Sequence, residues 1–563
     1  MIKPTKFVQN VKPYSPPISG RKNKIRLDFN ENNLPPSPKI LKTLDKEFLK
    51  ENINFYPEDT SLVQAISKKY NLLPNNVMIT NGSNAAIQAI INSFVEKGNE
   101  VILPFPTFSI YELLFCVRGV KLKKIFYNSD LSFPTNSILK VISPKTKVIV
   151  LVSPNNPTGS SIGKKDINKI LEKAKNTLVI LDEAYCHFSR QNYIPLIKRY
   201  DNLVILRTFS KAYSLGGLRI GFLLGNSEII SQLLKSNLPY RVNFFSQKAA
   251  LLSLSDQKYI EKNIKNILDE KNKLLLGFKK LGIKTVKTDT NFILFYAGIW
   301  AEMLYKELFN RGILIRNISK SQLLEGFLRV SIGTAQENKI FLKELKEIWK
   351  KRVIIFDLDG TLINVKNSFL KCTLKVFEHF CGKKLKSKDF DELKNLGGLN
   401  NDWDLVKYLL AKNGIRKSKT EIKKQFDKCY EKAKYNETLE IKKSVLGDLE
   451  KRFTLTVFSG RTKDEATFAY DFFGLNKYFK TTILAEDTGK KPKPHPLGIE
   501  LIKQKLDSKL AIYVGDTVDD YNSAKSANIE VVMIARTKKQ ERIFKKMGFE
   551  NILLDINKLV EVV

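Results

Sequence analysis

One lysine in the first half of the chain lies in a run that can bind a phosphate group. The run Thr208-Phe-Ser-Lys-Ala-Tyr-Ser-Leu-Gly-Gly-Leu-Arg219 carries Lys211 beside the hydroxyls of Thr208 and Ser210. Hydroxyls and an arginine suit phosphate oxygens, because the guanidinium donates two parallel hydrogen bonds. A lysine amine held beside such a phosphate can form a Schiff base with a carbonyl group. The run therefore predicts covalent chemistry at Lys211.

Two carboxylates in the second half are spaced for phosphoryl transfer. Asp357 directly follows the apolar run Val353–Phe356, and Asp359 lies two residues further on. Carboxylates this close can share a divalent cation. One of them can attack phosphorus while the other protonates the leaving oxygen. The pair predicts a magnesium-dependent phosphatase site, with Asp357 and Asp359 as its catalytic groups.

The first half also contains the other groups that pyridoxal 5'-phosphate (PLP) chemistry requires. A carboxylate must keep the pyridine nitrogen protonated, donors must hold the phenolic oxygen, and amides at a helix N-terminus can bind the phosphate. Asp182 ends the apolar run Leu178–Leu181, Tyr185 follows it, and Asn156 lies in a turn after another apolar run. The candidate PLP-binding residues are Ser83, Asn84, Asn156, Asp182, Tyr185, Thr208, Ser210 and Arg219.

The second half likewise completes its site downstream. Ser459 follows the run Leu455–Phe458, and Lys491 opens a Lys-Pro-Lys-Pro loop whose charge can neutralise phosphoryl oxygens. Asp516 and Asp520 follow a third apolar run and complete the predicted metal set with Asp357 and Asp359. Ligands of open α/β sheets bind at the carboxyl ends of strands, where three of these four stretches fall.

The elements that must position both sites alternate between short apolar runs and amphipathic helical segments. Four runs, at 100–103, 148–152, 178–181 and 203–206, are rich in β-branched residues and almost wholly apolar. Such runs are typical of parallel strands that are covered on both faces. The sequence predicts an α/β fold: a large doubly wound domain at about 31–235, preceded by an irregular arm at 1–30 and followed by a small α/β lobe at about 236–350.

A second α/β domain is expected at 351–563, because Arg352-Val-Ile-Ile-Phe356 begins a new strand with no flexible linker before it. Its segment at about 365–450 is charged and helical, and we predict a cap inserted into the core. Within it, Leu396–Trp403 is interpreted equally well as part of the substrate mouth or as an ordinary turn between helices.

Composition excludes several classes of protein. The formal net charge is +37, but the basic residues are spread along the chain and accompany no nucleic-acid motif, so no nucleic-acid partner is expected. No run approaches the ~20 apolar residues of a membrane span. The five cysteines show no metal-ligand spacing, which favours a reducing, cytoplasmic setting.

With these motifs in order, residues 10–350 resemble the fold-type I PLP aminotransferases, and most closely the histidinol-phosphate aminotransferases. The resemblance implies that Phe108 stacks on the PLP ring and that Tyr56 reaches the cofactor phosphate of a second subunit in a homodimer. It also implies four substrate contacts, at Tyr14, Asn30, Arg316 and Arg329. The sequence departs from the family where Phe108 replaces the usual tyrosine and where Asn84-Ala85 replaces Asp-Glu.

Residues 352–563 resemble the haloacid-dehalogenase (HAD) superfamily of phosphatases. The resemblance implies that Asp357 is the nucleophile, Asp359 the acid/base, and Ser459 and Lys491 the phosphoryl contacts. Asp516 would complete the Mg²⁺ site and Asp520 would support it, since Ala524 and Ala527 align best with that choice over Asp519. The cap resembles that of phosphoglycolate-phosphatase-like members, and the cysteine-rich zinc loop of the better-known HAD histidinol phosphatase is absent from the sequence.

Together the two resemblances imply a bifunctional enzyme of histidine biosynthesis. It would transaminate between histidinol phosphate and 2-oxoglutarate, giving glutamate and imidazole-acetol phosphate, and would hydrolyse histidinol phosphate. Three alternatives stay open: another phosphorylated amino substrate with a phosphatase of separate substrate, a PLP decarboxylase resembling threonine-phosphate decarboxylase, and a C-terminal half that is a binding module without activity.

Overall fold

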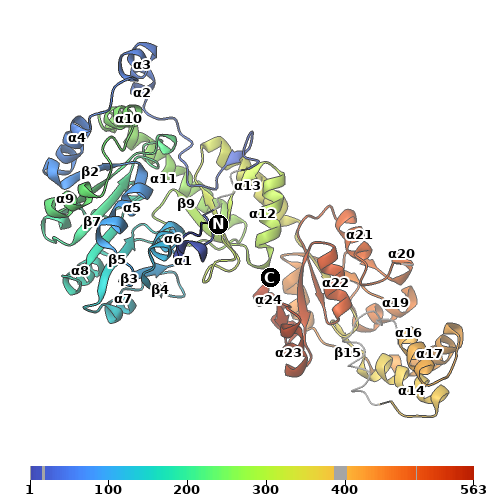
Figure 1. Cartoon of the computed structure of the whole chain (residues 1–563). Helices are drawn as coiled ribbons and strands as arrows, with labels where there is room; N and C mark the ends of the chain where they lie inside the picture. The colour runs from blue at the N-terminus through green and yellow to red at the C-terminus, as the bar shows by residue number, and fades with distance from the viewer. Residues whose placement is uncertain (1, 15–18, 386–401, 490) are drawn as a thin grey trace. The chain divides into compact units, whose positions relative to one another are not determined.

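The computed structural model describes every residue except 1, 15–18, 386–401 and 490 (Figure 1). The chain forms two compact units, each described here by itself. The first unit contains Met1–Ala297 and Leu308–Glu344, and the second contains Gly298–Glu307 and Leu345–Val563. Among the described residues, no helix combines the length and the apolar character that a membrane span needs.

A sheet of seven strands forms the centre of the first unit, in the order β2-β8-β7-β6-β5-β3-β4. Its strands are β2 (Val77–Thr80), β3 (Glu100–Phe105), β4 (Lys121–Phe126), β5 (Thr146–Val152), β6 (Leu178–Asp182), β7 (Leu203–Thr208) and β8 (Gly221–Gly225). The four predicted runs are β3, β5, β6 and β7, which lie side by side and run parallel. Strand β8 differs, because it is antiparallel to both of its neighbours.

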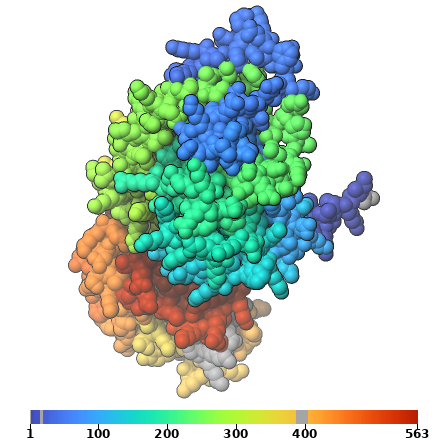
Figure 2. Space-filling model, turned by 90° about the vertical axis from the view of Figure 1, so that its left-hand side faces the viewer, coloured from blue at the N-terminus to red at the C-terminus, as the bar shows by residue number. Residues whose placement is uncertain are grey.

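Helices cover both faces of this sheet, which makes the domain doubly wound as the sequence predicts (Figure 1). They are α4 (Thr60–Tyr70), α5 (Gly82–Phe94), α6 (Ser109–Arg118), α7 (Thr135–Val141), α8 (Lys164–Lys173), α9 (Ser227–Lys235) and α10 (Phe244–Leu254). Strands β6 and β7 are buried along their whole length, because they have helices on both sides. The segment with α2 (Pro38–Thr43) and α3 (Lys46–Asn52) projects from the rest of the unit (blue in Figures 1 and 2).

The smaller lobe begins with the long helix α11 (Gln257–Lys280) and contains an antiparallel sheet of three strands in the order β11-β12-β9. These strands are β9 (Phe292–Tyr296), β11 (Arg316–Asn317) and β12 (Phe327–Ser331), and helix α13 (Ala335–Lys350) follows β12. Helix α12 (Ala301–Asn310), between β9 and β11 in the chain, belongs mostly to the second unit. The N-terminal arm is not wholly irregular. It forms a short helix α1 (Lys6–Gln9), and β1 (Ile25–Arg26) pairs in parallel with β10 (Ile313–Leu314), which ties the arm to this lobe.

The second unit has a parallel sheet of six strands in the order β17-β16-β13-β18-β19-β20. The strands are β13 (Val353–Phe356), β16 (Thr454–Phe458), β17 (Thr481–Ile483), β18 (Ala511–Gly515), β19 (Glu530–Ile534) and β20 (Ile552–Leu553). The helices around it are α18 (Lys443–Glu450), α19 (Lys463–Phe473), α20 (Ala485–Thr488), α21 (Leu497–Lys505), α22 (Val518–Ser526), α23 (Lys538–Lys546) and α24 (Leu559–Val562). The fully buried strand β13 is central, between β16 and β18.

A helical cap is inserted after β13, as predicted. Its described part contains a helical turn at Lys366–Leu370 and the helices α14 (Lys371–Cys381), α16 (Asp402–Lys412) and α17 (Lys419–Ala433). The antiparallel pair of β14 (Ile363–Asn364) and β15 (Thr438–Leu439) closes the insertion at its base. The predicted cap extends to about residue 450, but α18 packs against β16 and belongs to the core.

The cap has its own hydrophobic core, in which Cys372 and Cys429 form a disulfide. The two cysteines stand 57 residues apart in the chain, and no motif in the sequence pairs them. A disulfide is more common in an oxidising setting than in a reducing one. The cytoplasmic setting that the cysteine pattern favours stays a prediction. Most of the segment Leu396–Trp403 lies outside the described residues.

Candidate active sites

Lys211 lies directly after β7 and faces the arm. Its Nζ donates a hydrogen bond of 3.0 Å to the backbone oxygen of Phe29 and lies 5.7 Å from the centre of the Tyr185 ring. Burial, and then the positive charges of Arg329 and Arg219, lower the pKa of the Lys211 amine to about 7. A lysine with this pKa is about half neutral at pH 7, and only the neutral amine is a nucleophile.

Asp182 ends β6, the strand beside β7, and its side chain is almost fully buried. Tyr111 Oη donates to Asp182 Oδ2 at 2.9 Å, and the Ala184 amide donates to Oδ1 at 3.0 Å. Burial raises the pKa of this carboxyl group, and among the described residues no cation forms an ion pair with it. A buried carboxylate without a cation fits the protonated pyridine nitrogen of PLP, which would supply the missing charge.

The predicted phosphate cup is narrow enough to require glycine. Gly82 begins α5 with φ +71°, and a Cβ there would lie 2.8 Å from Arg219 Nη2. Arg219 Nη1 also donates to Ser210 Oγ at 3.4 Å, and Thr208 Oγ1 donates to the same oxygen at 3.0 Å. Ser83 and Asn84 occupy the first turn of α5, where backbone amides are free to bind an anion. The predicted phosphate ligands therefore come together at this helix end.

Asn30 and Tyr185 connect the arm to the cofactor side of the site. Asn30 Nδ2 donates to Tyr185 Oη at 2.8 Å, and the backbone amide of Asn30 donates to Ser331 Oγ at 2.9 Å. Burial raises the pKa of the Tyr185 phenol, so it stays protonated and can donate a hydrogen bond. The arm is thus held by both the large domain and the smaller lobe through one buried residue.

Two arginines of the small sheet stand side by side. Arg316 on β11 and Arg329 on β12 are directly paired across the antiparallel register. Arg329 donates to Asn156 Oδ1 and to the Asp28 backbone oxygen, while its buried Nε has no hydrogen-bond partner among the described residues. Burial, together with the nearby charge of Arg316, lowers the pKa of Arg329 to about 10. The pair therefore offers two positive charges to an anionic ligand.

The remaining predicted residues of the first site differ in their exposure. Phe108 precedes α6, and its ring packs edge-on against Tyr111, which binds Asp182. Tyr14 is 44% exposed. Tyr56 is 78% exposed and stacks on Tyr240. Its phenol makes no described contact with the site of its own chain, and its role toward a second subunit stays a prediction.

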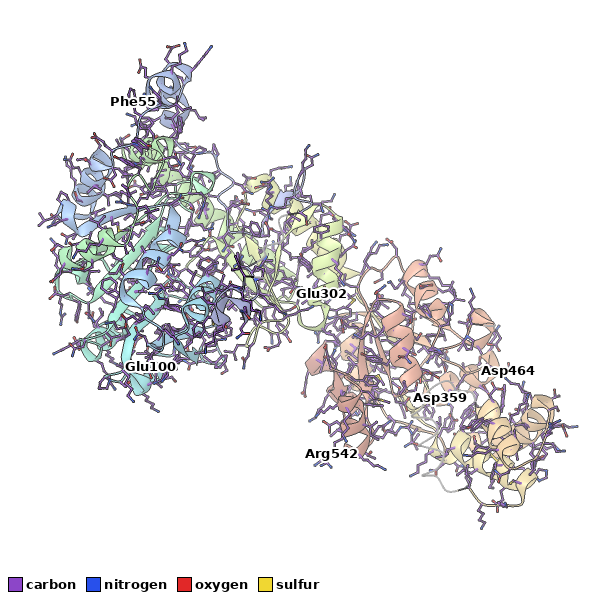
Figure 3. The ribbon with its side chains drawn as sticks, viewed as in Figure 1. Phe55, Glu100, Glu302, Asp359, Asp464 and Arg542 are labelled. Atoms are coloured by element: carbon purple, nitrogen blue, oxygen red, sulfur yellow. A yellow bond between two sulfur atoms is a disulfide. The ribbon has the colours of Figure 1, made fainter. Side chains whose placement is uncertain are left out.

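The second site is built at adjacent strand ends. Phe356 of β13 pairs with Val457 of β16 on one side and with Val514 of β18 on the other. Residues just beyond these strands therefore come together at one sheet edge, which brings Asp357, Ser459 and Asp516 into one site. Gly360, directly after Asp359, has φ +80° and has no room for a Cβ, since one would lie 2.1 Å from Asp516 Oδ2. Figure 3 labels Asp359 between this sheet and the cap helices.

The prediction that Lys491 binds the phosphoryl group is corrected by the structure. Lys491 is exposed, whereas Lys493 is buried and its Nζ lies 2.6 Å from Asp357 Oδ1 and 2.8 Å from Asp520 Oδ1. Burial alone would lower the pKa of Lys493, but the two carboxylates outweigh it and raise the pKa. The two lysines flank Pro492, and the conformation of the loop decides which side chain points into the site. The spacing in the sequence alone does not predict that conformation.

Three carboxylates can hold a metal ion here. Each of Asp357, Asp516 and Asp520 offers an oxygen, and these oxygens lie within 4.8 Å of one another. Burial raises the pKa of Asp357, and the charges of the neighbouring aspartates add to the rise. Asp359 was predicted as a further metal ligand, but its carboxylate faces Arg461 Nη2 at 2.6 Å instead. A buried set of carboxylates with a raised pKa fits a divalent cation, which would relieve their mutual repulsion.

A cavity of about 1270 Å³ lies over these carboxylates. The core contributes Asp357, Asp359 and Ser459 to its wall, and the cap contributes Phe369 and Trp403. The cavity therefore lies between sheet and cap, with the reactive groups at its floor. Trp403 gives structural support to the interpretation that the C-terminal end of Leu396–Trp403 lines the substrate mouth.

Arg461 belongs to one of the predicted motifs of this site, but the sequence analysis predicts no role for it. Arg461, in Phe458-Ser-Gly-Arg461, is 1% exposed and binds both Asp359 and the cap residue Glu437. Its partners are distant in the chain, so nothing in the spacing indicates them. The only signal in the sequence is the arginine itself, two residues after Ser459.

Known proteins resemble both parts of the chain. Residues 22–345 match the family model described as aminotransferase class I and II, and residues 354–534 match the model described as haloacid dehalogenase-like hydrolase. The histidinol-phosphate aminotransferase of Ruminiclostridium cellulolyticum is 34% identical over 332 residues, which are 58% of this chain and 92% of that protein. Histidinol-phosphate aminotransferase 1 of Carboxydothermus hydrogenoformans is 34% identical over 354 residues, 62% of this chain and 100% of that protein.

A solved structure agrees with these relatives. The histidinol-phosphate aminotransferase from Clostridium acetobutylicum superposes with a TM-score of 0.54 at 25% identity, covering 57% of this chain and 98% of that one. The first family model covers more than half of the chain, and the second matches the unit that contains Asp357. The chain therefore belongs to the class I and II aminotransferase family and carries a haloacid dehalogenase-like hydrolase domain after its aminotransferase domain.

Proposed function

We propose that the chain is a bifunctional enzyme of histidine biosynthesis. Its first domain would exchange an amino group between histidinol phosphate and 2-oxoglutarate, with PLP as cofactor. Its second domain would hydrolyse a phosphomonoester with Mg²⁺, and histidinol phosphate is the proposed substrate. The observation that carries the first half is the pair Arg316 and Arg329 in register beside the enclosed Lys211.

The residues around Lys211 suit PLP. The cofactor supplies an electron-accepting ring that lets an amino group move between two carbon skeletons. Asp182 would bind the pyridine nitrogen, Asn156 and Tyr185 the phenolic oxygen, and the cup at α5 the phosphate. Lys211, about half neutral at pH 7 because of its low pKa, would take and return the proton at the substrate carbon.

The two arginines favour a substrate with an anionic end. A phosphate accepts bidentate hydrogen bonds from a guanidinium, and so does the carboxylate of glutamate. One pair of arginines can therefore serve both substrates of a transaminase in turn: Arg329 for a carboxylate, with Arg316 beside it for the phosphate. The unpartnered Nε of Arg329 leaves a donor for such a ligand.

In the second domain Asp357 would attack phosphorus while Asp359 protonates the ester oxygen that leaves. Water would then attack the phosphorylated aspartate, and Asp359 would take its proton, which releases inorganic phosphate and restores both carboxyl groups. Lys493 and Mg²⁺, held by Asp357 and Asp516 with support from Asp520, would offset the negative charge of the phosphoryl group.

Histidinol phosphate could be a substrate of both domains. It is the product of the transaminase in the biosynthetic direction, and it contains the phosphomonoester that a phosphatase hydrolyses. A phosphatase in the same chain would perform the next step. The positive net charge of +37 would draw such anionic substrates toward both sites.

We also propose a homodimer through the aminotransferase domain. The projecting segment at α2 and α3 exposes several large apolar side chains: Leu41 (71%), Ile53 (68%), Phe55 (67%) and Tyr56 (78%). An apolar surface of this kind is typical of a protein interface. Figure 3 labels Phe55 at the projecting end. Sedimentation of the purified chain tests this proposal, and a monomer at micromolar concentration would contradict it.

The experiment for each half uses one variant. The purified chain should show the visible absorbance of bound PLP, and Lys211→Ala should abolish it together with glutamate formation. Asp357→Asn should abolish Mg²⁺-dependent phosphate release from histidinol phosphate. A protein without the visible band would refute the first half, and phosphate release that survives Asp357→Asn would refute the assigned phosphatase site.

A further inference from the structure

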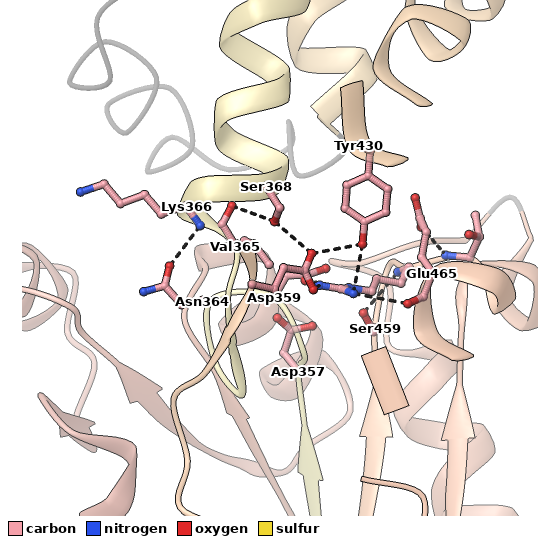
Figure 4. A network of polar contacts seen from close by, with 12 residues as sticks. Asp357, Asp359, Asn364, Val365, Lys366, Ser368, Tyr430, Ser459 and Glu465 are labelled. Carbon is pink, nitrogen blue, oxygen red and sulfur yellow. Dashed lines mark hydrogen bonds and ion pairs between the residues drawn. The ribbon is translucent and has the colours of Figure 1, made fainter. Parts of the chain in front are cut away.

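Arg461 lies at the junction of core and cap and binds two carboxylates. It follows β16, its side chain is 1% exposed, and its Nη2 lies 2.6 Å from Asp359 Oδ1 and 3.0 Å from Glu437 Oε2. Its Nε also donates to Asp359 Oδ1 at 2.8 Å. Figure 4 labels Asp359, Ser368 and Tyr430 in this network of polar contacts.

Glu437, the second carboxylate, is anchored by the cap. Ser368 Oγ donates to Glu437 Oε1 at 2.9 Å, and Tyr430 Oη donates to the same oxygen at 3.1 Å. The Glu437 side chain is fully buried, whereas that of Asp359 is 30% exposed and lines the cavity. Arg461 therefore has one carboxylate partner that lines the cavity and one that does not.

The charges of this group explain why Arg461 stays in place. Burial alone would lower the pKa of Arg461, but the charges of Asp359 and Glu437 outweigh it and raise the pKa. An acid/base carboxyl group loses its charge each time it takes up a proton. Glu437 keeps a carboxylate on Arg461 through that change, and a buried arginine left without one would be costly.

We propose that Arg461 is a positioning residue for Asp359 and that the cap, through Glu437, fixes the place from which Asp359 exchanges its proton with the leaving group. This inference rests on the proposed phosphatase function. It goes further because it makes proton transfer at Asp359 depend on a residue whose described contacts include none of the metal carboxylates. An acid misplaced by about 1 Å transfers protons poorly, so the arginine acts through geometry.

Two aryl phosphates whose leaving groups differ in basicity separate this role from a structural one. p-Nitrophenyl phosphate releases a stable phenolate that needs no proton, whereas phenyl phosphate releases a phenolate that benefits from one. With the full-length chain and Mg²⁺, Arg461→Lys should lower kcat/KM for phenyl phosphate about 10-fold more than for p-nitrophenyl phosphate. Glu437→Gln should show the same asymmetry and carries the test if Arg461→Lys does not fold.

A double-mutant cycle shows whether Arg461 acts through Asp359. Asp359→Asn should show the asymmetry by itself, and Arg461→Lys added to it should change kcat/KM less than about 2-fold. The matched control is Arg352→Lys, a buried arginine of the same unit that does not line the cavity and should alter neither ester.

Equal losses for both esters, or an undiminished effect of Arg461→Lys in the Asp359→Asn background, would overturn the positioning role. If the wild-type chain released no Asp357-dependent phosphate from p-nitrophenyl phosphate, that result would refute the proposed function itself. The inference would then fall with it.

Discussion

Lys493 Nζ lies 2.6 Å from Asp357 Oδ1, at the point where the nucleophile must approach a phosphoryl group. The same ammonium binds Asp520, so one buried cation holds two of the three carboxylates that could bind metal. A buried cation in this position offsets the repulsion between Asp357 and an incoming dianion. The contact also links the lysine loop to the end of β13.

Lys493→Ala should therefore abolish most phosphatase activity. Removing one preorganised charge from a phosphoryl-transfer site costs about 10²- to 10³-fold in kcat. Lys491→Ala is the matched control, since Lys491 is exposed in the same loop and should keep wild-type kcat. Phosphate release from p-nitrophenyl phosphate measures both variants, and a larger loss at Lys491 would contradict the placement of the loop.

Arg316→Gln should separate the two substrates of the aminotransferase. If Arg316 binds the phosphate and Arg329 the carboxylate, Arg316→Gln should raise KM for histidinol phosphate about 10- to 100-fold, as the loss of a hydrogen bond between charged groups does. KM for glutamate should change much less. Steady-state kinetics with each substrate varied in turn checks this, and equal changes for both would assign Arg316 to a different role.

Attachment of PLP to the cofactor-free chain should depend on pH in one direction. Lys211 has a pKa of about 7, and only its neutral amine reacts, so the rate should rise about tenfold per pH unit below 7 and level off above it. Stopped-flow absorbance after addition of PLP measures the rate. A rate that kept rising to pH 10 would show that the lysine has an ordinary pKa.

The buried pair of Arg207 and Glu183 should stabilise the aminotransferase domain. Nε and Nη2 of Arg207 both lie 2.7 Å from Glu183 Oε2, and the two side chains are 8% and 0% exposed. Arg207→Met leaves a buried charge unpaired and should cost about 3–5 kcal/mol. Adding Glu183→Gln should recover part of that loss. Thermal loss of the PLP absorbance reports this domain alone, and no difference between the single and double variants would contradict the pairing.

The sequence predicts the strands and most of the site residues, because both depend on the order of residues within a short segment. Short β-branched runs such as 178–181 predict buried strands, and polar residues just after such runs fall at one sheet edge. Asp182, Asp357 and Asp516 were found in this way. Strand β8 has equally apolar residues, but its antiparallel direction depends on the path of the chain between β7 and β8.

The residues that the sequence did not reveal depend on distant contacts. Lys493 and Lys491 have the same chemistry and differ only in the turn of their loop. The role of Arg461 depends on its ion pair with Glu437. Glu437 directly precedes β15, the strand that closes the cap at its base, and is far from Arg461 in the chain. Cys372 and Cys429 are likewise brought together by the packing of α14 on α17.

A single coupled assay tests the central claim that one chain performs both reactions on one phosphorylated compound. Histidinol phosphate and 2-oxoglutarate are supplied to the purified chain with PLP and Mg²⁺, and glutamate and inorganic phosphate are followed separately. We predict that both form, that Lys211→Ala removes only glutamate, and that Asp357→Asn removes only phosphate. Glutamate without phosphate from the wild-type chain would contradict the claim.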